Sequence, residues 1–395
     1  MAITRHIFRH ALPALLCGAF SIVAGPLAGT AHAAGIGGVF DAGWSTAYYA
    51  QDSITHMHQR LHALGMDEVV LQYAAVEATH LYYPSELDFL QNTQYRNNQL
   101  FPKSIEAAKT AGTKIWLGLY YNGDNWYTPP TAEQLDTLSA RNLRVLEEIH
   151  ALYGNESVVE GVYIPQEIAR YYWDGLRNDA TPEMLTEHFL KPVTEAAQAK
   201  GWKVMAAPFY NQNLENPKKL QTFFEKLFAA GFKPDIIAVQ DGVGASDAGK
   251  HHAETSNVAQ YERAVAQACS QYGIDFWADM ELFRTDDSHA LADSARISAQ
   301  LDSAYAAGAV KVIGYDLAVL GNAGLDSLEK WKLESGVEPP ARIYEAPRES
   351  RRASHARNEK SQKRELFLNG RLQNSRPLNE NSQYFKANGV KVKQN

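Results

Sequence analysis

Two glutamates end two short apolar segments of the chain in the same way. Glu167 ends Val-Tyr-Ile-Pro-Gln-Glu, and Glu281 ends Phe-Trp-Ala-Asp-Met-Glu. An apolar run of this length, bounded by polar residues, is typical of a buried strand. Two carboxyl groups that face each other can share the acid, base and nucleophile roles needed to break a bond. The chemistry therefore depends on whether the fold brings Glu167 and Glu281 together.

Strand-like and helix-like segments alternate along most of the chain. Strands are expected at 37–41, 68–73, 114–121, 158–165, 203–209, 235–240, 275–279 and 311–315, and helices at 54–64, 102–111, 132–153, 182–199, 217–230, 258–272 and 288–307. This alternation is typical of a parallel sheet. Eight such units predict an α/β protein, a (β/α)8 TIM barrel over residues 34–338. An open doubly wound sheet is the alternative, although the Gly-x-Gly-x-x-Gly fingerprint of a dinucleotide fold is absent.

In this count, Glu167 and Glu281 belong to the fourth and seventh strands. The carboxyl ends of all eight strands lie on one face of a barrel, and active sites are built there. Side chains alternate between the two faces of a strand. In the seventh strand, the inward set is Asp275, Trp277, Asp279 and Glu281, and the outward set is Phe276, Ala278 and Met280. Acids in the inward set are expected near a solvated end of the barrel, because an unpartnered buried carboxylate is costly.

Aromatic, amide and acidic side chains follow the expected carboxyl ends of the strands. Flat rings stack on the C–H faces of sugars, and amides and acids bind sugar hydroxyls. The candidate substrate-binding residues are Asp41, Trp44, Gln72, Tyr120, Asn122, Trp126, Gln166, Tyr210, Asn211, Gln240, Asp241, Asp279, Tyr315 and Asp316. For Asp41, Asp241 and Asp316 taken singly, a helix cap or an ion pair with a loop arginine is an equally good interpretation.

These residues predict a glycoside hydrolase that cleaves a polysaccharide or oligosaccharide with retention of configuration. Retaining hydrolysis uses two carboxyl groups roughly 5–5.5 Å apart. The apolar neighbours Pro165 and Ile168 favour the protonated form of Glu167, which is the predicted acid/base. Glu281 is the predicted nucleophile, kept ionised by Tyr210 or Gln240. The aromatic-rich loops favour a cleft for several sugar units and hence endo action.

Four motifs carry a resemblance to known proteins. They are Tyr-Ile-Pro-Gln-Glu, Ala-Pro-Phe-Tyr, Asp-Ile-Ile-Ala-Val-Gln-Asp-Gly-Val-Gly and Phe-Trp-Ala-Asp-Met-Glu-Leu-Phe. Over about residues 35–333 the chain resembles a bacterial glycoside-hydrolase-like TIM-barrel domain family of unknown function. The order of the glutamates also resembles the clan of retaining glycosidases with catalytic Glu on strands four and seven. In that clan, Asn precedes the acid/base and binds the substrate 2-hydroxyl; this chain has Gln166 instead.

The two ends of the chain differ from its body. Arg5 and Arg9, an apolar stretch and Ala31-His32-Ala33 predict a signal peptide over residues 1–33, and so a periplasmic or secreted protein with no transmembrane segment after its removal. Residues 341–395 hold 13 Lys/Arg against 5 Asp/Glu. This composition predicts a disordered basic tail over residues 339–395. Its alternative role is contact with an anionic polymer or an acidic membrane surface.

Charge and motifs argue against several other classes of partner and ligand. Between leader and tail the net charge is −17, which argues against nucleic acid as a partner. No cofactor is expected, and a metal site at His251 and His252 with Asp247 is disfavoured because adjacent histidines on a loop seldom bind one metal. Two alternatives remain. One is a non-catalytic carbohydrate-binding barrel, and the other is a component of exopolysaccharide or envelope assembly that acts through the basic tail.

Overall fold

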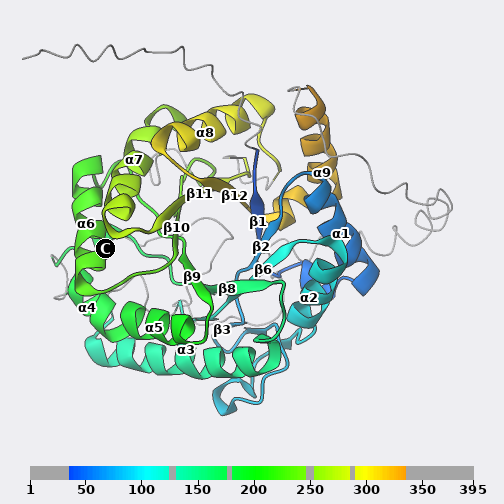
Figure 1. The fold of residues 1–395 in the computed structure, drawn as a ribbon, viewed down its shortest axis with the longest axis horizontal. Helices are drawn as coiled ribbons and strands as arrows, with labels where there is room; N and C mark the ends of the chain where they lie inside the picture. Colours follow the sequence, from blue (N-terminus) through cyan, green and yellow to red (C-terminus); the bar gives the residue numbers. More distant parts are fainter. Residues whose placement is uncertain (1–34, 124–129, 176–179, 246–252, 285–289, 335–395) are drawn as a thin grey trace, which may run out of the picture. The chain divides into compact units, whose positions relative to one another are not determined.

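Eight parallel strands form a closed barrel (Figure 1). The computed structural model describes residues 35–123, 130–175, 180–245, 253–284 and 290–334. The barrel strands, each paired with the next and the last with the first, are β1 (Gly38–Asp41), β2 (Glu68–Leu71), β6 (Lys114–Gly118), β8 (Val159–Ile164), β9 (Lys203–Ala206), β10 (Ile236–Gln240), β11 (Asp275–Glu281) and β12 (Lys311–Tyr315). The predicted TIM barrel is confirmed, and the open-sheet alternative is wrong.

Helices surround the barrel (Figure 1). They are α1 (Gln51–Ala63), α2 (Leu100–Ala111), α3 (Ala132–Tyr153), α4 (Pro182–Leu185), α5 (Lys191–Ala199), α6 (Pro217–Ala230), α7 (Thr255–Tyr272), α8 (Ser294–Ala307) and α9 (Leu317–Glu334). The bounds of α3 match the prediction, and a capping box between Thr131 and Gln134 fixes its start. The predicted helix over 182–199 is divided by a π-helical turn, Thr186–Leu190. Helix α9 was not predicted.

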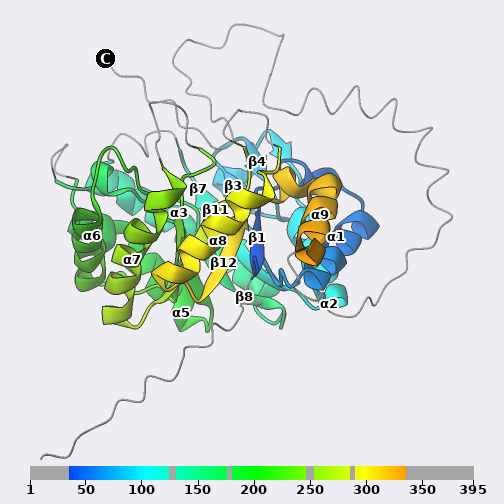
Figure 2. The same ribbon diagram turned by 90° about the horizontal axis from the view of Figure 1, so that it is seen from above.

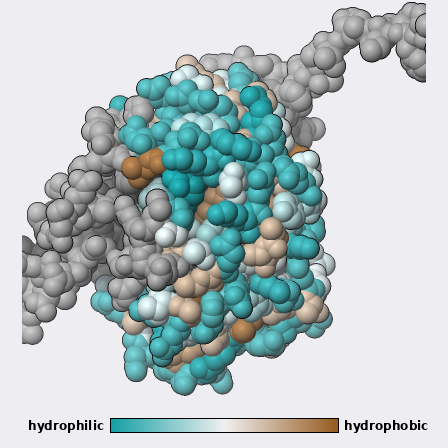
Figure 3. Space-filling view, turned by 90° about the vertical axis from the view of Figure 1, so that its left-hand side faces the viewer, coloured by the Kyte–Doolittle hydropathy of each residue, from teal (hydrophilic) through white to brown (hydrophobic). Residues whose placement is uncertain are grey.

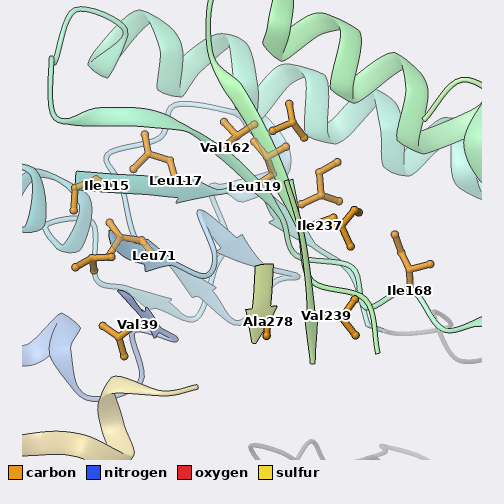
Figure 4. Close-up of a cluster of buried hydrophobic side chains, with 14 of the residues drawn as sticks. Val39, Leu71, Ile115, Leu117, Leu119, Val162, Ile168, Ile237, Val239 and Ala278 are labelled. Atoms are coloured by element: carbon orange, nitrogen blue, oxygen red, sulfur yellow. The ribbon is translucent and has the colours of Figure 1, made fainter. Parts of the chain in front are cut away.

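Two apolar layers hold the barrel together. One fills its interior and includes Trp116, Tyr163 and Trp277; the rings of Trp116 and Trp277 meet edge to face at 6.2 Å. The other lies between strands and helices and contains Phe276, Ala278 and Met280. The alternation predicted for the seventh strand is therefore confirmed. Figure 4 shows part of the outer layer, with side chains from β1, β2, β6, β8, β10 and β11.

Glycine permits close strand contact at one point of the barrel wall. A Cβ on Gly161 in β8 would lie 2.0 Å from the backbone carbonyl oxygen of Lys203 in β9. Any larger residue would push the two strands apart. Since β8 carries the segment that leads to Glu167, this contact helps to fix the position of the fourth strand end.

A small second sheet adjoins one end of the barrel. It joins β5 (Tyr95–Arg96), β4 (His80–Leu81), β3 (Ala75–Val76) and β7 (Tyr120–Tyr121) in that order. Figure 2 shows β3, β4 and β7 at the same end of the barrel. The sequence predicted only a long loop between β2 and α2, because strands of two residues leave no alternating pattern. The ring of His80 in β4 meets that of Trp44, and the ring of Tyr121 in β7 meets that of Tyr73.

The surface over α6 and α7 is mostly hydrophilic, with apolar residues scattered singly (Figure 3). Among the described residues, no helix combines the length and apolarity needed to cross a membrane. The predicted leader, residues 1–33, and the predicted tail, residues 339–395, lie outside the described residues.

Candidate active site at the carboxyl ends of the strands

Glu167 and Glu281 belong to the fourth and seventh barrel strands, as the sequence predicted. Glu281 is the last residue of β11, and Glu167 follows β8 by three residues. Glu281 lies in the inward register of β11 with Trp277 and Asp279, and it is 6% exposed. Glu167 is half-buried. The strand count on which the chemistry depends is therefore correct.

Asp241, which directly follows β10, is bonded closely to the end of β11. Its Oδ1 accepts hydrogen bonds from the backbone N–H groups of Glu281 at 3.3 Å and Val243 at 3.0 Å. Its Oδ2 accepts one from Gln300 Nε2 at 2.5 Å. Glu281 Oε2 in turn accepts a hydrogen bond from the N–H of Ala245 at 2.5 Å. The loop after β10 thus holds both carboxyl groups in place.

The pKa of Glu281 is raised to about 8. Burial is the main cause, and the neighbouring charge of Asp241 is the second. Burial also raises the pKa of Asp241, to about 6. The prediction that Tyr210 or Gln240 keeps Glu281 ionised is wrong. Gln240 Nε2 donates to the carbonyl of Ala207, and the deciding influences on Glu281 are loss of water and a second carboxyl group. At neutral pH the free protein holds a proton on Glu281.

Three further carboxyl groups share this end of the barrel. Burial raises the pKa of Asp279 well above its usual range, and the charges of Glu281, Asp241, Glu167 and Asp316 add to the effect. Burial raises the pKa of Asp316 to about 7 and also raises that of Asp41. We call the six residues the acidic cluster: Asp41, Glu167, Asp241, Asp279, Glu281 and Asp316.

Two members of the acidic cluster also stabilise local backbone. Asp41 Oδ1 accepts hydrogen bonds from the N–H of Gly43 and the hydroxyl of Thr46, at 2.8 and 2.7 Å. Asp316 Oδ1 accepts one from the N–H of Val319 at 3.0 Å, so it caps α9. The capping interpretation is confirmed for Asp316. Both carboxyl groups nevertheless remain within electrostatic reach of each other.

Aromatic rings line the cluster on the β1 and β2 side. Burial raises the pKa of Tyr73, and the charges of Glu167 and Asp316 contribute, which places this ring beside both acids. Tyr73 meets Trp44 at 5.9 Å and Tyr121 at 5.4 Å between ring centroids. The Tyr315 hydroxyl donates to Gln72 Oε1 at 3.2 Å. The predicted residues Trp44, Gln72 and Tyr315 therefore lie with the acids.

Other predicted residues serve the scaffold. Tyr120 packs against Phe89 and Arg141, in the layer between strands and helices. Asn211 shapes its own loop, since its N–H donates to Glu215 Oε1 at 2.9 Å. Tyr210 is buried and stacks on Tyr261 of α7 at 4.9 Å. Asn122 is half-buried, and Trp126 lies outside the described residues, as do His251, His252 and Asp247.

Only one end of the Gln166 side-chain amide has a hydrogen-bond partner within the protein. Its Nε2 donates to the carbonyl of Tyr120 at 2.9 Å, whereas its Oε1 has no hydrogen-bond partner although the residue is 1% exposed. The NH₂ group therefore supports the backbone. The oxygen remains available to a donor on a ligand.

Three functional residues were missed by sequence reasoning. Arg296 of α8 donates to the carbonyls of Glu281 and Phe283, and Gln300 of the same helix donates to Asp241 and to the Glu281 carbonyl. The charge of Glu262 in α7 raises the pKa of Tyr210, and the charge of Asp241 raises the pKa of Glu262. One signal was available: Glu262 and Gln300 are polar residues on otherwise apolar helix faces.

Metal binding has no support in the described part of the chain. Within it, no three His, Cys, Asp or Glu side chains are arranged to hold a metal ion. Four carboxyl groups of the cluster, those of Asp41, Asp241, Glu281 and Asp316, instead accept hydrogen bonds from N–H, hydroxyl or amide donors.

Glu262 gives a prediction about stability. It is fully buried, and neither carboxyl oxygen has a hydrogen-bond partner; burial raises its pKa well above the usual range, and Asp241 adds to this. We expect Glu262→Met to raise the free energy of unfolding by about 1–3 kcal/mol, because it removes an unsatisfied buried polar group. Chemical denaturation followed by circular dichroism measures this change.

The gain should be larger at pH 8 than at pH 5. The native state keeps a proton on Glu262 that the unfolded chain releases above its ordinary pKa, so this residue makes stability fall as pH rises, and Met removes that dependence. Glu195→Met, at an exposed position of α5, is the matched control and should change stability by less than about 0.5 kcal/mol. A less stable Glu262→Met protein at both pH values would show that the carboxyl group is stabilising.

The fold and the site together define a class of protein: a (β/α)8 barrel whose strand ends carry an acidic, aromatic-lined site. The chain belongs to the family of the domain of unknown function DUF4434, whose model matches residues 50–322. No curated protein is significantly similar in sequence.

Solved structures share the fold. A protein described as "a putative alpha-L-fucosidase" from Bacteroides thetaiotaomicron VPI-5482 is similar with a TM-score of 0.64 and 17% sequence identity, over 77% of this chain and 96% of that one. A GH18 chitinase from Pseudoalteromonas aurantia is similar at 11% identity with a TM-score of 0.43, over 74% of this chain and 98% of that one. At these identities the likeness shows the fold alone, and the second score carries no argument.

Proposed function

We propose that this protein is a glycoside hydrolase that cleaves a polysaccharide, with Glu167 and Glu281 as its catalytic carboxyl groups. The observation that carries the proposal is the pair itself. Two glutamates stand at the ends of the fourth and seventh strands and interact electrostatically, and Glu167 lies near the ring of Tyr73, which meets that of Trp44. Paired carboxyl groups beside sugar-stacking rings are what glycosidic cleavage requires.

The protonation of Glu281 supports a particular division of labour. A general acid must carry a proton at the working pH, and a pKa of about 8 meets this need. We therefore assign Glu281 as the proton donor and Glu167 as the nucleophile. The reverse assignment, with Glu167 as acid/base and Glu281 as nucleophile, follows from the resemblance to the retaining clan, and it requires Glu281 to lose its proton before reaction.

A reducing-end assay over a panel of polysaccharides tests the activity. We expect hydrolysis of at least one polysaccharide, and we expect proton NMR of the first product to show the anomeric configuration of the substrate, as a retaining mechanism requires. Heat-denatured protein is the control. Inversion would contradict the retaining mechanism while leaving the hydrolase assignment in place.

A non-catalytic carbohydrate-binding barrel is the second candidate. One observation favours it: the amide NH₂ of Gln166, which corresponds in position to the substrate-binding Asn of the retaining clan, is bonded to the carbonyl of Tyr120. Binding of a polysaccharide without any turnover would support this candidate.

We further propose that the protein acts outside the cytoplasm, since the sequence of residues 1–33 is typical of a signal peptide. N-terminal sequencing of protein recovered from the periplasm would test whether this segment is removed.

A further inference from the structure

The six carboxyl groups of the acidic cluster exceed what a two-carboxyl mechanism uses. Glu167 and Glu281 account for catalysis, and Asp316 and Asp41 hold local backbone. Asp279 has neither task. It lies in the inward register of β11, between Trp277 and Glu281, and is 1% exposed.

Asp279 is also incompletely satisfied. Its Oδ1 has no hydrogen-bond partner. Gln166 Oε1, equally buried and adjacent in sequence to Glu167, lacks one as well. Unsatisfied buried polar atoms are costly, so two of them at the carboxyl ends of the barrel strands need an explanation. Gln166 Oε1 can only accept, and Asp279 Oδ1 accepts once its carboxyl group ionises, so a ligand that satisfies both must bring N–H or O–H donors.

The charges around Asp279 indicate which kind of donor, neutral or cationic, suits this position. Glu281, Asp241, Glu167 and Asp316 all oppose ionisation of Asp279. The cation whose charge favours ionisation of Asp241 and Glu281 is Arg296, and its Nη2 donates to the carbonyls of Glu281 and Phe283. A neutral hydroxyl would satisfy one acceptor and leave the repulsion unchanged, whereas an ammonium group supplies three donors and a compensating charge.

The aromatic rings fit the same ligand. Tyr73 lies beside Glu167 and Asp316, and Trp44 adjoins it. Ring faces next to carboxyl groups attract cations as well as stack on sugars. We propose that the acidic cluster binds a sugar unit with a free protonated amine, as in a deacetylated amino-sugar polysaccharide, and that Asp279 is the residue that receives the amine. This inference rests on the proposed function of the site and adds the substrate class.

Three tetrasaccharides that differ only at carbon 2 test the proposal. They are the β-1,4-linked tetramers of glucosamine, N-acetylglucosamine and glucose, offered to the wild-type protein by calorimetry at a pH where the amine is protonated. We expect the amine form to bind at least about tenfold more tightly than the other two, and the difference to shrink as salt is added. Equal binding of the three, or failure of the amine form to bind, overturns the proposal.

A matched pair of variants separates the site from general attraction to an acidic protein. Asp279→Asn and Asp275→Asn each replace a carboxyl group by an amide on the same face of β11, but Asp275 is exposed at the other end of the strand, about 13 Å away. We expect Asp279→Asn to abolish the preference for the amine and Asp275→Asn to keep it. Thermal unfolding checks that both variants fold. Equal effects of the two substitutions would mean that the preference is not located at Asp279.

The outcomes also separate this inference from the proposed function. Hydrolysis of a neutral polysaccharide without any amine preference overturns only the substrate class. Full activity after replacement of Glu167 and Glu281 overturns the hydrolase mechanism, whichever tetrasaccharide binds.

Discussion

Glu167→Gln and Glu281→Gln are each expected to lower kcat/KM by about 10²- to 10⁴-fold on the polysaccharide that the wild-type protein hydrolyses. Glutamine keeps the size of each side chain but can neither donate an acidic proton nor attack the sugar. The expected loss is large because each carboxyl group acts on the reacting bond itself. Initial rates of reducing-end release, measured at substrate concentrations well below KM, give the comparison.

The same two strands provide controls. Glu160→Gln alters β8 near its amino end, where Glu160 pairs with Lys114 and Lys203. Asp275→Asn likewise alters the amino end of β11. Both should keep activity within about twofold, since neither residue lies near the strand ends that carry the site. If Glu167→Gln or Glu281→Gln also kept full activity, that residue would have no part in catalysis.

Alanine variants show which glutamate is the nucleophile. With the nucleophile removed, added azide can attack the sugar directly and gives a glycosyl azide of inverted configuration. With the acid/base removed, azide attacks the covalent intermediate and the product keeps the starting configuration. We expect inversion for Glu167→Ala and retention for Glu281→Ala. The opposite result would restore the assignment that follows from the resemblance to the retaining clan.

The pH dependence of kcat/KM is the second large effect. With Glu281 as proton donor, kcat/KM should fall about tenfold per pH unit above pH 8, because its pKa in the free protein is about 8 and the donor is lost above that pH. With Glu281 as nucleophile, kcat/KM should instead rise about tenfold per unit up to pH 8. A profile from pH 5 to pH 10, corrected for stability, distinguishes the two signs.

Asp241→Asn tests the cause of this pKa. The charge of Asp241 raises the pKa of Glu281, so its removal should move the pH limb toward lower pH. Asn can still accept the N–H groups of Glu281 and Val243, and Gln300 can turn its unpartnered Oε1 toward the new NH₂ group. Asp275→Asn should leave the limb in place. An unmoved limb in Asp241→Asn would show that the charge of Asp241 does not raise the pKa of Glu281.

Much of the fold could be predicted because its signals are local. Apolar runs and helical periodicity located all eight barrel strands, and they gave the bounds of β12, α3 and α6 as the structure has them. Alternation along β11 separated Trp277 inside the barrel from Phe276 outside it. The strands β3, β4 and β5 of the small sheet were missed because they are too short to alternate, whereas β7 falls within the strand predicted over 114–121. Helix α9 was missed as well; its backbone leaves helical geometry at Gly321.

Sequence alone therefore determined the barrel, the strand count and the placement of Glu167 and Glu281 at the fourth and seventh strand ends. The tertiary structure decided the protonation of Glu281 and the burial of Asp279 without a hydrogen-bond partner for its Oδ1. Both depend on residues distant in sequence, such as Asp241 for Glu281, and on how completely the surrounding elements exclude water. Secondary structure follows from the order of side chains along the chain, whereas a pKa follows from burial and through-space charge, which only the folded arrangement sets.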